Sequence, residues 1–141
     1  NFTLAMFEEA RKLSPRPLVA NEVERHPFLD QSRMAKACRD AGAALIAYTP
    51  LARAQDLDSD PVLREIAAEL GVSPVQVVLA WHFGIPGNIP VPRTKSPQRL
   101  AENLHALDLV LTPDQRARID ALQSANRRVV NTDFSPVWDQ P

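Results

Sequence analysis

The sequence contains one cysteine, and no apolar run reaches the roughly 18–20 residues that a transmembrane helix requires. The single cysteine, Cys38, excludes an intramolecular disulfide, and no cysteine–histidine spacing typical of a zinc site occurs, so we predict no metal. Walker loops, glycine-rich dinucleotide fingerprints and nucleophilic triads are also absent. Without a signal pattern at the N-terminus, we expect a cytoplasmic protein with no membrane partner.

Neither sign of charge dominates, because the formal net charge is −1 at pH 7. This balance gives no reason to expect nucleic acid as a partner, and it leaves a small neutral or anionic ligand open. A length of 141 residues, 45% of them hydrophobic, suffices for one globular domain with a core. The chain opens at Asn1 with neither a methionine nor a targeting segment before it, so we expect a piece of something longer.

Three short runs, residues 18–24, 43–49 and 88–93, have the composition of β-strands, and each is followed by a helical pattern. Strands that alternate with helices indicate an α/β protein with a parallel sheet. Helices are expected over residues 6–13, 34–41, 61–70, 74–81, 97–107 and 113–123. The helix over residues 74–81 is apolar nearly all round, so it is expected to be buried.

Many of the thirteen prolines are compatible with this fold. Four follow a capping residue at the start of an expected helix, where a missing N–H costs nothing: Pro61, Pro74, Pro97 and Pro113. Pro90 and Pro92 weaken the prediction of the third strand, because proline removes ladder hydrogen bonds. The tail over residues 127–141 is expected to lie on the surface, anchored by its apolar side chains Phe134, Val137 and Trp138.

The segment from Pro92 to Arg99 places three cations and two hydroxyls where the third strand runs into a helix. Exposed N–H groups and the helix dipole attract anions at such a corner, and arginines can fork onto phosphate oxygens. This indicates a phosphate site. A solvated basic turn is an equally good interpretation of the residues alone.

Tyr48 ends the second apolar strand, at the edge where parallel α/β folds place ligands, so its ring could stack on a flat ligand. A buried structural tyrosine is the usual alternative. Glu22 and Glu24 point to one side of the first strand and suggest acid–base chemistry, although satisfied strand-end polar groups are commoner. The three histidines, His26, His82 and His105, are interpreted as structural or without function.

Taken together, the motifs resemble the second half of an aldo-keto reductase over almost the whole chain. Asn1-Phe2-Thr3 resembles the family's Ser-Asn-Phe, and residues 21–27 resemble its Asn-Gln-x-Glu-x-His-Pro. Residues 47–51 resemble Ala-Tyr-Ser-Pro-Leu, and residues 91–103 resemble Ile-Pro-Lys-Ser-x-x-x-Arg-x-x-Glu-Asn. The short connection from Leu51 to Asp60 and the C-terminal segment over residues 127–139 are most similar to those of the bacterial 2,5-diketo-D-gluconate reductases. Some of these enzymes also reduce methylglyoxal.

The resemblance implies one partial (β/α)8 TIM-barrel domain over residues 1–141, with strands six to eight and the N-terminal half absent. It also implies NADP as the cofactor. The residues whose family counterparts hold the cofactor are Asn1, Glu22, Tyr48, Thr49, Leu51, Arg53, Arg93, Thr94, Ser96, Arg99, Glu102 and Asn103. In the family, Asn1 and the residue at 22 meet the nicotinamide carboxamide and Tyr48 stacks on its ring. The segment over residues 49–53 lines the pyrophosphate, and residues 93–103 bind the 2′-phosphate and adenine.

Two residues depart from the family pattern. Glu22 replaces glutamine, and a carboxylate cannot donate to the carboxamide oxygen, which implies weaker or reoriented nicotinamide binding. Arg93 replaces the commoner lysine and keeps the charge.

The family's catalytic aspartate, tyrosine, lysine and histidine have no counterparts here, and Tyr48 belongs to the stacking position. We therefore expect a small-carbonyl reductase by family whose isolated 141-residue chain is inactive. Three parallel strands leave open edges and an exposed inner face, so the missing half or self-association is expected to cover them. A non-catalytic nucleotide-binding module and a self-associating fragment are the alternatives.

Overall fold

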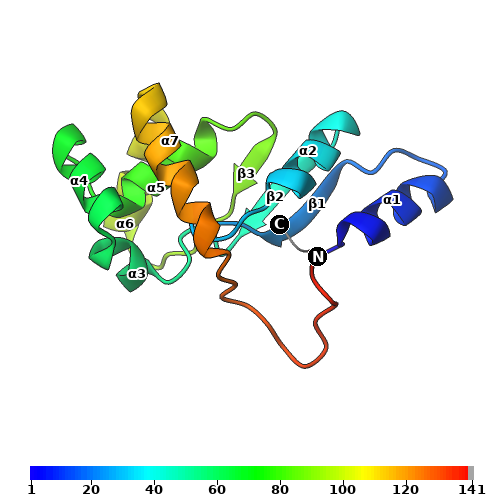
Figure 1. The fold of residues 1–141 in the computed structure, drawn as a ribbon. Helices are drawn as coiled ribbons and strands as arrows, with labels where there is room; N and C mark the ends of the chain where they lie inside the picture. The colour runs from blue at the N-terminus through cyan, green and yellow to red at the C-terminus, as the bar shows by residue number, and fades with distance from the viewer. Residues whose placement is uncertain (140–141) are drawn as a thin grey trace.

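The computed structural model describes residues 1–139 and has a three-stranded parallel sheet flanked by helices (Figure 1). The strands are β1 (Ala20–Glu24), β2 (Ala44–Tyr48) and β3 (Asn88–Pro90), in the order β1-β2-β3. The helices are α1 (Leu4–Leu13), α2 (Ser32–Asp40), α3 (Ala54–Ser59), α4 (Pro61–Leu70), α5 (Pro74–Phe83), α6 (Pro97–His105) and α7 (Pro113–Ala121). Two 3₁₀ turns, η1 (Ala106–Asp108) and η2 (Leu122–Ala125), follow α6 and α7. The predicted α/β class with a parallel sheet is confirmed.

The third strand is shorter than the sequence predicts. It covers three residues, and the last hydrogen bond of the sheet on this side runs from the Val91 N–H to the Ala47 carbonyl, 3.0 Å apart. Pro92 lies beyond the strand, where its missing N–H removes no ladder bond. The predicted extension to residue 93 is therefore wrong.

Four helices begin as the proline pairs predict. Asp60, Ser73, Ser96 and Thr112 each accept a hydrogen bond from a backbone N–H of the following turn, and proline occupies the first turn. The connection from Leu51 to Asp60 contains a further short helix, α3, which the sequence analysis missed. Its N-cap, Arg53, makes no side-chain capping bond, so the sequence carries no start signal for this helix.

The core has two parts. One joins α4, α5 and α7. The residues of α5 from Val77 to His82 are all buried, as predicted, and Val77, Val78, Ala80 and Trp81 belong to this part of the core. The other packs α1 and α2 against one face of the sheet through Phe7, Val23 and Leu45. The opposite face is open, with Glu22 exposed and Ile89 at 50% exposure.

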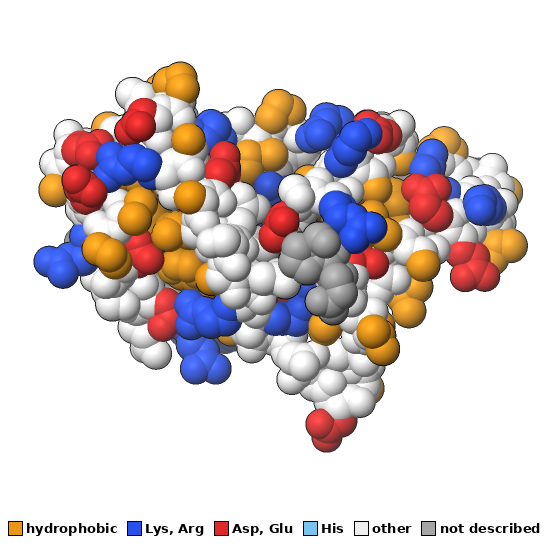
Figure 2. Space-filling model, in the orientation of Figure 1, with side chains coloured by type: hydrophobic (Ala, Val, Ile, Leu, Met, Phe, Trp, Pro, Cys, Tyr) orange, Lys and Arg blue, Asp and Glu red, His pale blue; other side chains and the backbone are white. Residues whose placement is uncertain are grey.

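Charged side chains gather on the surface of α4 and α7, where Figure 2 shows acidic and basic groups side by side. Arg118 of α7 contacts Glu65 and Glu69 of α4 at 2.7 and 2.8 Å. No single helix among residues 1–139 is long and apolar enough to cross a membrane. The pair α4 and α5 passes that test only when joined, and it is bent by 87°.

The C-terminal tail loops away from the helices and returns to the N-terminus (Figure 1). Its predicted anchoring by Phe134 and Val137 is wrong, because these side chains are 90% and 94% exposed. Trp138 is half-buried and does anchor the tail, as predicted, and further contacts add to it. Val129 and Val130 donate their N–H groups to the Glu24 carboxylate, and the Arg128 guanidinium lies 3.8 Å from the Trp138 ring centroid.

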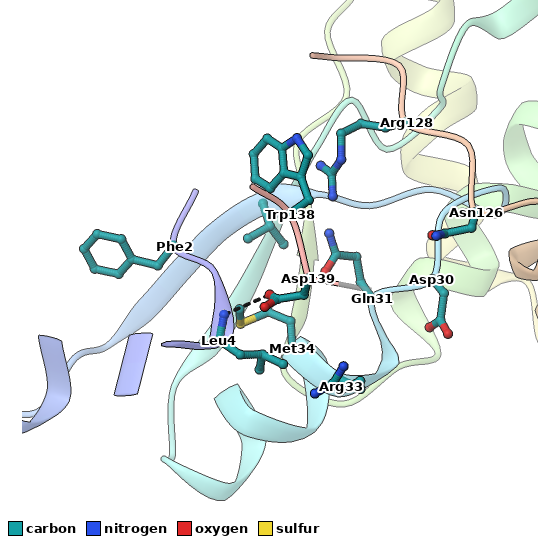
Figure 3. Close-up of a pocket in the computed structure, with 11 residues that line it drawn as sticks. Phe2, Leu4, Asp30, Gln31, Arg33, Met34, Asn126, Arg128, Trp138 and Asp139 are labelled. Atoms are coloured by element: carbon teal, nitrogen blue, oxygen red, sulfur yellow. Dashed lines mark hydrogen bonds between the residues drawn. The ribbon is translucent and has the colours of Figure 1, made fainter. Parts of the chain in front are cut away.

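Close to its end, the tail also contacts the start of α1. Figure 3 shows Asp139 pointing at the Leu4 N–H, which donates to its carboxylate over 2.8 Å. Trp138, Asp139, Phe2 and Met34 help to line a small space there of about 30 Å³, which has room for about two water molecules. This space lies between the two ends of the chain and is too small for an organic ligand.

Candidate functional site

The corner between β3 and α6 is held by short-range hydrogen bonds. The Thr94 hydroxyl accepts from the Ser96 N–H at 3.1 Å, and the Ser96 hydroxyl accepts from the Arg99 N–H at 3.3 Å. Ser96 is the N-cap of α6, so the free N–H groups and the positive end of the helix dipole face the corner. This geometry arises from the sequence Thr-Lys-Ser-Pro, whose hydroxyls and proline favour a helix start.

The cations of this corner have no acidic partner. Arg93, Lys95 and Arg99 form no salt bridge with any carboxylate of residues 1–139, and Arg93 and Arg99 are exposed. An unpaired group of three positive charges at a helix N-terminus attracts anions. The arrangement can bind a phosphate group.

A pocket of about 300 Å³ opens at this corner. It brings together six residues that the sequence singled out: Leu51, Arg93, Thr94, Arg99, Glu102 and Asn103. Its walls are completed by Ala54, Asp58, Ser73 and Val75, which the sequence analysis missed. The capping box of Ser73 and Gln76 was visible as a helix start, but nothing in the sequence placed that start beside residue 93.

A second pocket of about 290 Å³ adjoins the first. Leu51, Ala54 and Arg93 line both pockets, and Thr49 and Pro92 belong to the second. Together they form one extended surface from the end of β2 to the first turns of α6. Arg53 lines neither pocket and is exposed at the start of α3.

The backbone at the end of β2 has an unusual conformation. Thr49 and Ala52 have φ values of 49° and 47°, in the left-handed region that side chains with a β-carbon disfavour. The Ala52 N–H donates to the Thr49 carbonyl at 2.9 Å and closes a tight turn. Strained turns of this kind recur at ligand-binding sites, where the backbone must approach a ligand closely.

Tyr48 is the last residue of β2, so it lies at the same edge of the sheet as the cationic corner, but it lines neither pocket. The ring is half-buried, and its hydroxyl makes no hydrogen bond within residues 1–139. Burial, with a contribution from Glu24, raises the pKa of the Tyr48 phenol. The phenol is thus neutral near pH 7.

Glu22 lies on the neighbouring strand, β1, and Asn1 lies beside it. The amino group of Asn1 donates to the Glu22 carbonyl at 2.7 Å, which ties the first residue to β1. The Glu22 side chain is exposed on the open face of the sheet. The structure therefore brings both residues to the face on which Ile46 and Tyr48 also lie.

The Glu22 and Glu24 pair is not an acid–base pair. The Glu24 carboxylate is fully buried, lies 2.9 Å from Nε2 of His26 and accepts the N–H groups of Val129 and Val130. His26 Nδ1 accepts from the Phe28 N–H, so Nε2 carries the proton that Glu24 accepts. Glu24 and His26 are structural, which agrees with the commoner interpretation of these residues.

His82 is also structural. Its Nε2 donates to the Pro50 carbonyl at 3.0 Å, and its Nδ1 accepts from the Asn88 amide at 3.0 Å. Burial lowers the pKa of His82 to about 3, so the ring is neutral near pH 7. The ring thereby fixes the loop that follows Thr49 to the start of β3.

A sequence model of the aldo/keto reductase family matches residues 1–124. The chain belongs to the aldo/keto reductase family. It is 36% identical over 152 aligned positions to aldo/keto reductase slr0942 of Synechocystis sp., covering 100% of this chain and 45% of the relative. It is 33% identical over 127 positions to 2,5-diketo-D-gluconic acid reductase B of Corynebacterium sp., covering 90% and 44%.

Solved structures of this reductase family have the same fold. A proposed 2,5-diketo-D-gluconic acid reductase B superposes with a TM-score of 0.90 at 34% identity, over 99% of this chain and 50% of that one. The aldo-keto reductase of Bombyx mori, solved in complex with NADP, superposes with a TM-score of 0.83 at 26% identity, over 92% and 45%. The chain thus spans about half the length of the aldo/keto reductases that it matches.

Proposed function

We propose that this chain is the C-terminal, cofactor-binding half of an NADP-dependent aldo-keto reductase. The observation that carries the proposal is the continuous surface from Thr49 through Arg93 to Asn103, which begins directly after Tyr48 at the end of β2. An aromatic residue thus precedes one end of this surface, and unpaired cations with a helix N-terminus lie at the other. A dinucleotide has the matching order of groups, with a flat ring, a pyrophosphate and a phosphorylated nucleoside.

The residues present fit NADP. Arg93, Thr94, Ser96 and Arg99 supply cations and hydroxyls for the 2′-phosphate, and Glu102 with Asn103 lines the same pocket for adenine. Thr49 and Leu51 border the space for the pyrophosphate, with Arg53 exposed close by. Tyr48 offers its ring face to the nicotinamide, and Asn1 with Glu22 flanks it. The chemistry that this cofactor supplies when bound is hydride transfer to a small aldehyde, ketone or diketo sugar acid.

The residues of this chain bind and orient, and none of them donates the proton. Glu24, His26 and His82 have structural partners, and Tyr48 is committed to the stacking surface. We infer that the catalytic groups come from the other half of the barrel. The isolated chain is accordingly inactive.

The open face of the sheet supports a missing partner. Ile89 and Val91 are 50% and 52% exposed, and within residues 1–139 no further strand pairs with the outer edge of β1 or β3. Leu100, Leu104 and Leu107 add an apolar stripe on α6 and η1, each more than half exposed. A barrel that closes over these surfaces removes them from water, which favours a complementary half over a solitary domain.

Titration of the chain with NADPH and NADH tests the proposal. We expect tighter binding of NADPH, and Arg99→Ala is expected to weaken NADPH binding about tenfold while leaving NADH binding unchanged. Arg64→Ala, an exposed arginine on α4, is the matched control and should leave both affinities unchanged. Equal affinity for both nucleotides, or the same loss in the control variant, would overturn the assignment.

A further inference from the structure

Asp58 places a negative charge without a partner in the candidate nucleotide pocket. It lies on α3 and lines the pocket of about 300 Å³ together with Arg93 and Arg99. Its side chain is exposed, and within residues 1–139 its carboxylate takes part in no salt bridge. The Asp58 carboxylate is therefore free to act on a ligand in this pocket.

The neighbours of Asp58 hold it at the pocket. Leu57, the preceding residue, is fully buried in the core, and Ala54 of the same helix also lines the pocket. Asp60, just after α3, caps α4 by accepting from the Leu63 N–H at 3.0 Å. Figure 1 shows α3 and α6 close together, so Asp58 borders the nucleotide pocket from a different element than the cations do.

The other aspartate of α3, Asp56, has different surroundings. Its carboxylate lies 3.1 Å from Nη1 of Arg127 in the tail, and it lines neither pocket of the candidate site. Asp56 thus contacts the tail, whereas Asp58 borders the pocket. One short helix therefore offers the same charge in two settings, which allows a matched comparison.

The charged groups that line the pocket balance in number. Arg93 and Arg99 supply two positive charges, and Asp58 and Glu102 supply two negative ones. Glu102 accepts from the Gln98 amide at 2.9 Å, so its carboxylate is partly engaged within α6. Asp58 has no such donor. The pocket is consequently less attractive to an anion than its two arginines alone would make it.

A carboxylate in this place discriminates between the two nicotinamide dinucleotides. The 2′-phosphate of NADPH carries about −1.5 to −2 charges near pH 7, and a carboxylate repels it. NADH has a ribose hydroxyl there, which is neutral and can donate to a carboxylate. A charge that opposes one ligand and accepts the other changes specificity without any loss of the favourable contacts.

We propose that Asp58 is a specificity-determining residue that weakens the preference for NADPH, so that the chain binds both dinucleotides. Arg93 and Arg99 favour the 2′-phosphate, and Asp58 opposes it. NADPH still binds more tightly, by less than about tenfold. The inference rests on the proposed function, because it takes the pocket of Arg93 and Arg99 as the site of the adenosine end.

Titration of the 141-residue chain with NADPH and NADH at low salt tests this role. Asp58→Asn removes the charge but keeps an acceptor oxygen, so we expect about fivefold tighter NADPH binding and unchanged NADH binding. Adenosine 2′,5′-bisphosphate and AMP should show the same contrast, because they contain the adenosine end alone. At about 0.5 M salt, the effect on NADPH should fall below about twofold.

Asp56→Asn is the matched control, and it should leave the ratio of the two affinities unchanged. Equal tightening of NADPH and NADH by Asp58→Asn would mean that the charge acts on the pyrophosphate, and it would overturn the proposal. An unchanged ratio in Asp58→Asn, or the same shift in Asp56→Asn, would also overturn it. If Arg99→Ala still weakens NADPH binding, these results refute only the role of Asp58. If the unmodified chain binds neither dinucleotide, the proposed function fails as well.

Discussion

The Glu24 carboxylate, at the end of β1, accepts a hydrogen bond from the Val130 N–H over 3.0 Å and across 106 residues of sequence. The same carboxylate accepts from Val129 and contacts His26, so one buried side chain joins the sheet to the tail. The residue paired with Glu24 on β2 is Tyr48. The tail is therefore fixed beside the proposed nicotinamide end of the site.

Glu24→Gln should release the tail. The variant keeps the shape of the side chain but loses the charge and one acceptor, so we expect a loss of about 1–3 kcal/mol in the free energy of unfolding. The N–H groups of Val129 and Val130 should exchange with solvent faster, as measured by hydrogen exchange. Glu22→Gln, an exposed carboxylate on the same strand, serves as the control. Unchanged exchange in the tail of Glu24→Gln would contradict this role.

The same contact predicts a pH dependence. Burial raises the pKa of Glu24, but hydrogen bonds from His26, Val129 and Val130 outweigh it, so the pKa is lower than in the unfolded chain. The stabilisation is thus complete above the unfolded pKa and is lost as the pH falls toward the folded one. Denaturant unfolding between pH 7 and pH 3 should show this loss in the unmodified chain and a shallower one in Glu24→Gln.

His82 should add its own acid sensitivity. Its folded pKa of about 3 lies below the value of the unfolded side chain, so the unfolded state binds the extra proton between these values. Stability should fall as the pH drops below about 6.5, by up to about 1.4 kcal/mol per pH unit. The difference between the unmodified chain and His82→Gln isolates this contribution. Parallel stability curves for the two proteins would show that His82 does not remain neutral when folded.

Packing, and not the surface ion pairs, should hold α7 to α4. Arg118 contacts Glu65 and Glu69 at the surface, where solvent and salt screen the charges, so Arg118→Ala should hardly change the free energy of unfolding. Its neighbour Ile119 is fully buried, and Ile119→Ala should cost about 2–5 kcal/mol. Urea unfolding of both variants at low and high salt compares the two contributions directly.

The sequence predicts local features well and long-range ones poorly. At the helix starts of Asp60, Ser73, Ser96 and Thr112, a hydroxyl or carboxylate accepts from an N–H three residues later and a proline follows directly, so the local pattern itself contains the interaction. The Glu24 contact with Val130 depends on where the tail returns to the sheet, and the tail has no periodic pattern that would show this. The apolar residues Phe134 and Val137 therefore led to a wrong prediction of how the tail is anchored.

The candidate site divides in the same way. Thr94, Ser96 and Arg99 lie within one strand-to-helix corner, and their motif made them predictable. Asp58 and Ser73 reach the pocket from other elements of the fold. No local sequence pattern shows which distant residues come together, so sequence reasoning could not find these contacts.

The exposed apolar surfaces should make the isolated chain self-associate. Leu104 is 56% exposed on α6, and the free edge of β3 with Ile89 adds backbone groups that can pair with another chain. Sedimentation should give a mass above 15.6 kDa that rises with protein concentration. Leu104→Lys should shift the association to higher concentration, because a charge on the stripe opposes burial. Leu13→Lys, at the exposed end of α1, should not.

The complementary half of the barrel should compete with this self-association, since it covers the same stripe and edge. Addition of an N-terminal half from a relative should therefore yield a complex of one copy of each half in place of the larger species. A folded monomer of 15.6 kDa at every concentration, unaffected by the added half, would mean that the open face needs no cover. In that case the chain would function as a domain in its own right, and its assignment as half of a barrel enzyme would fail.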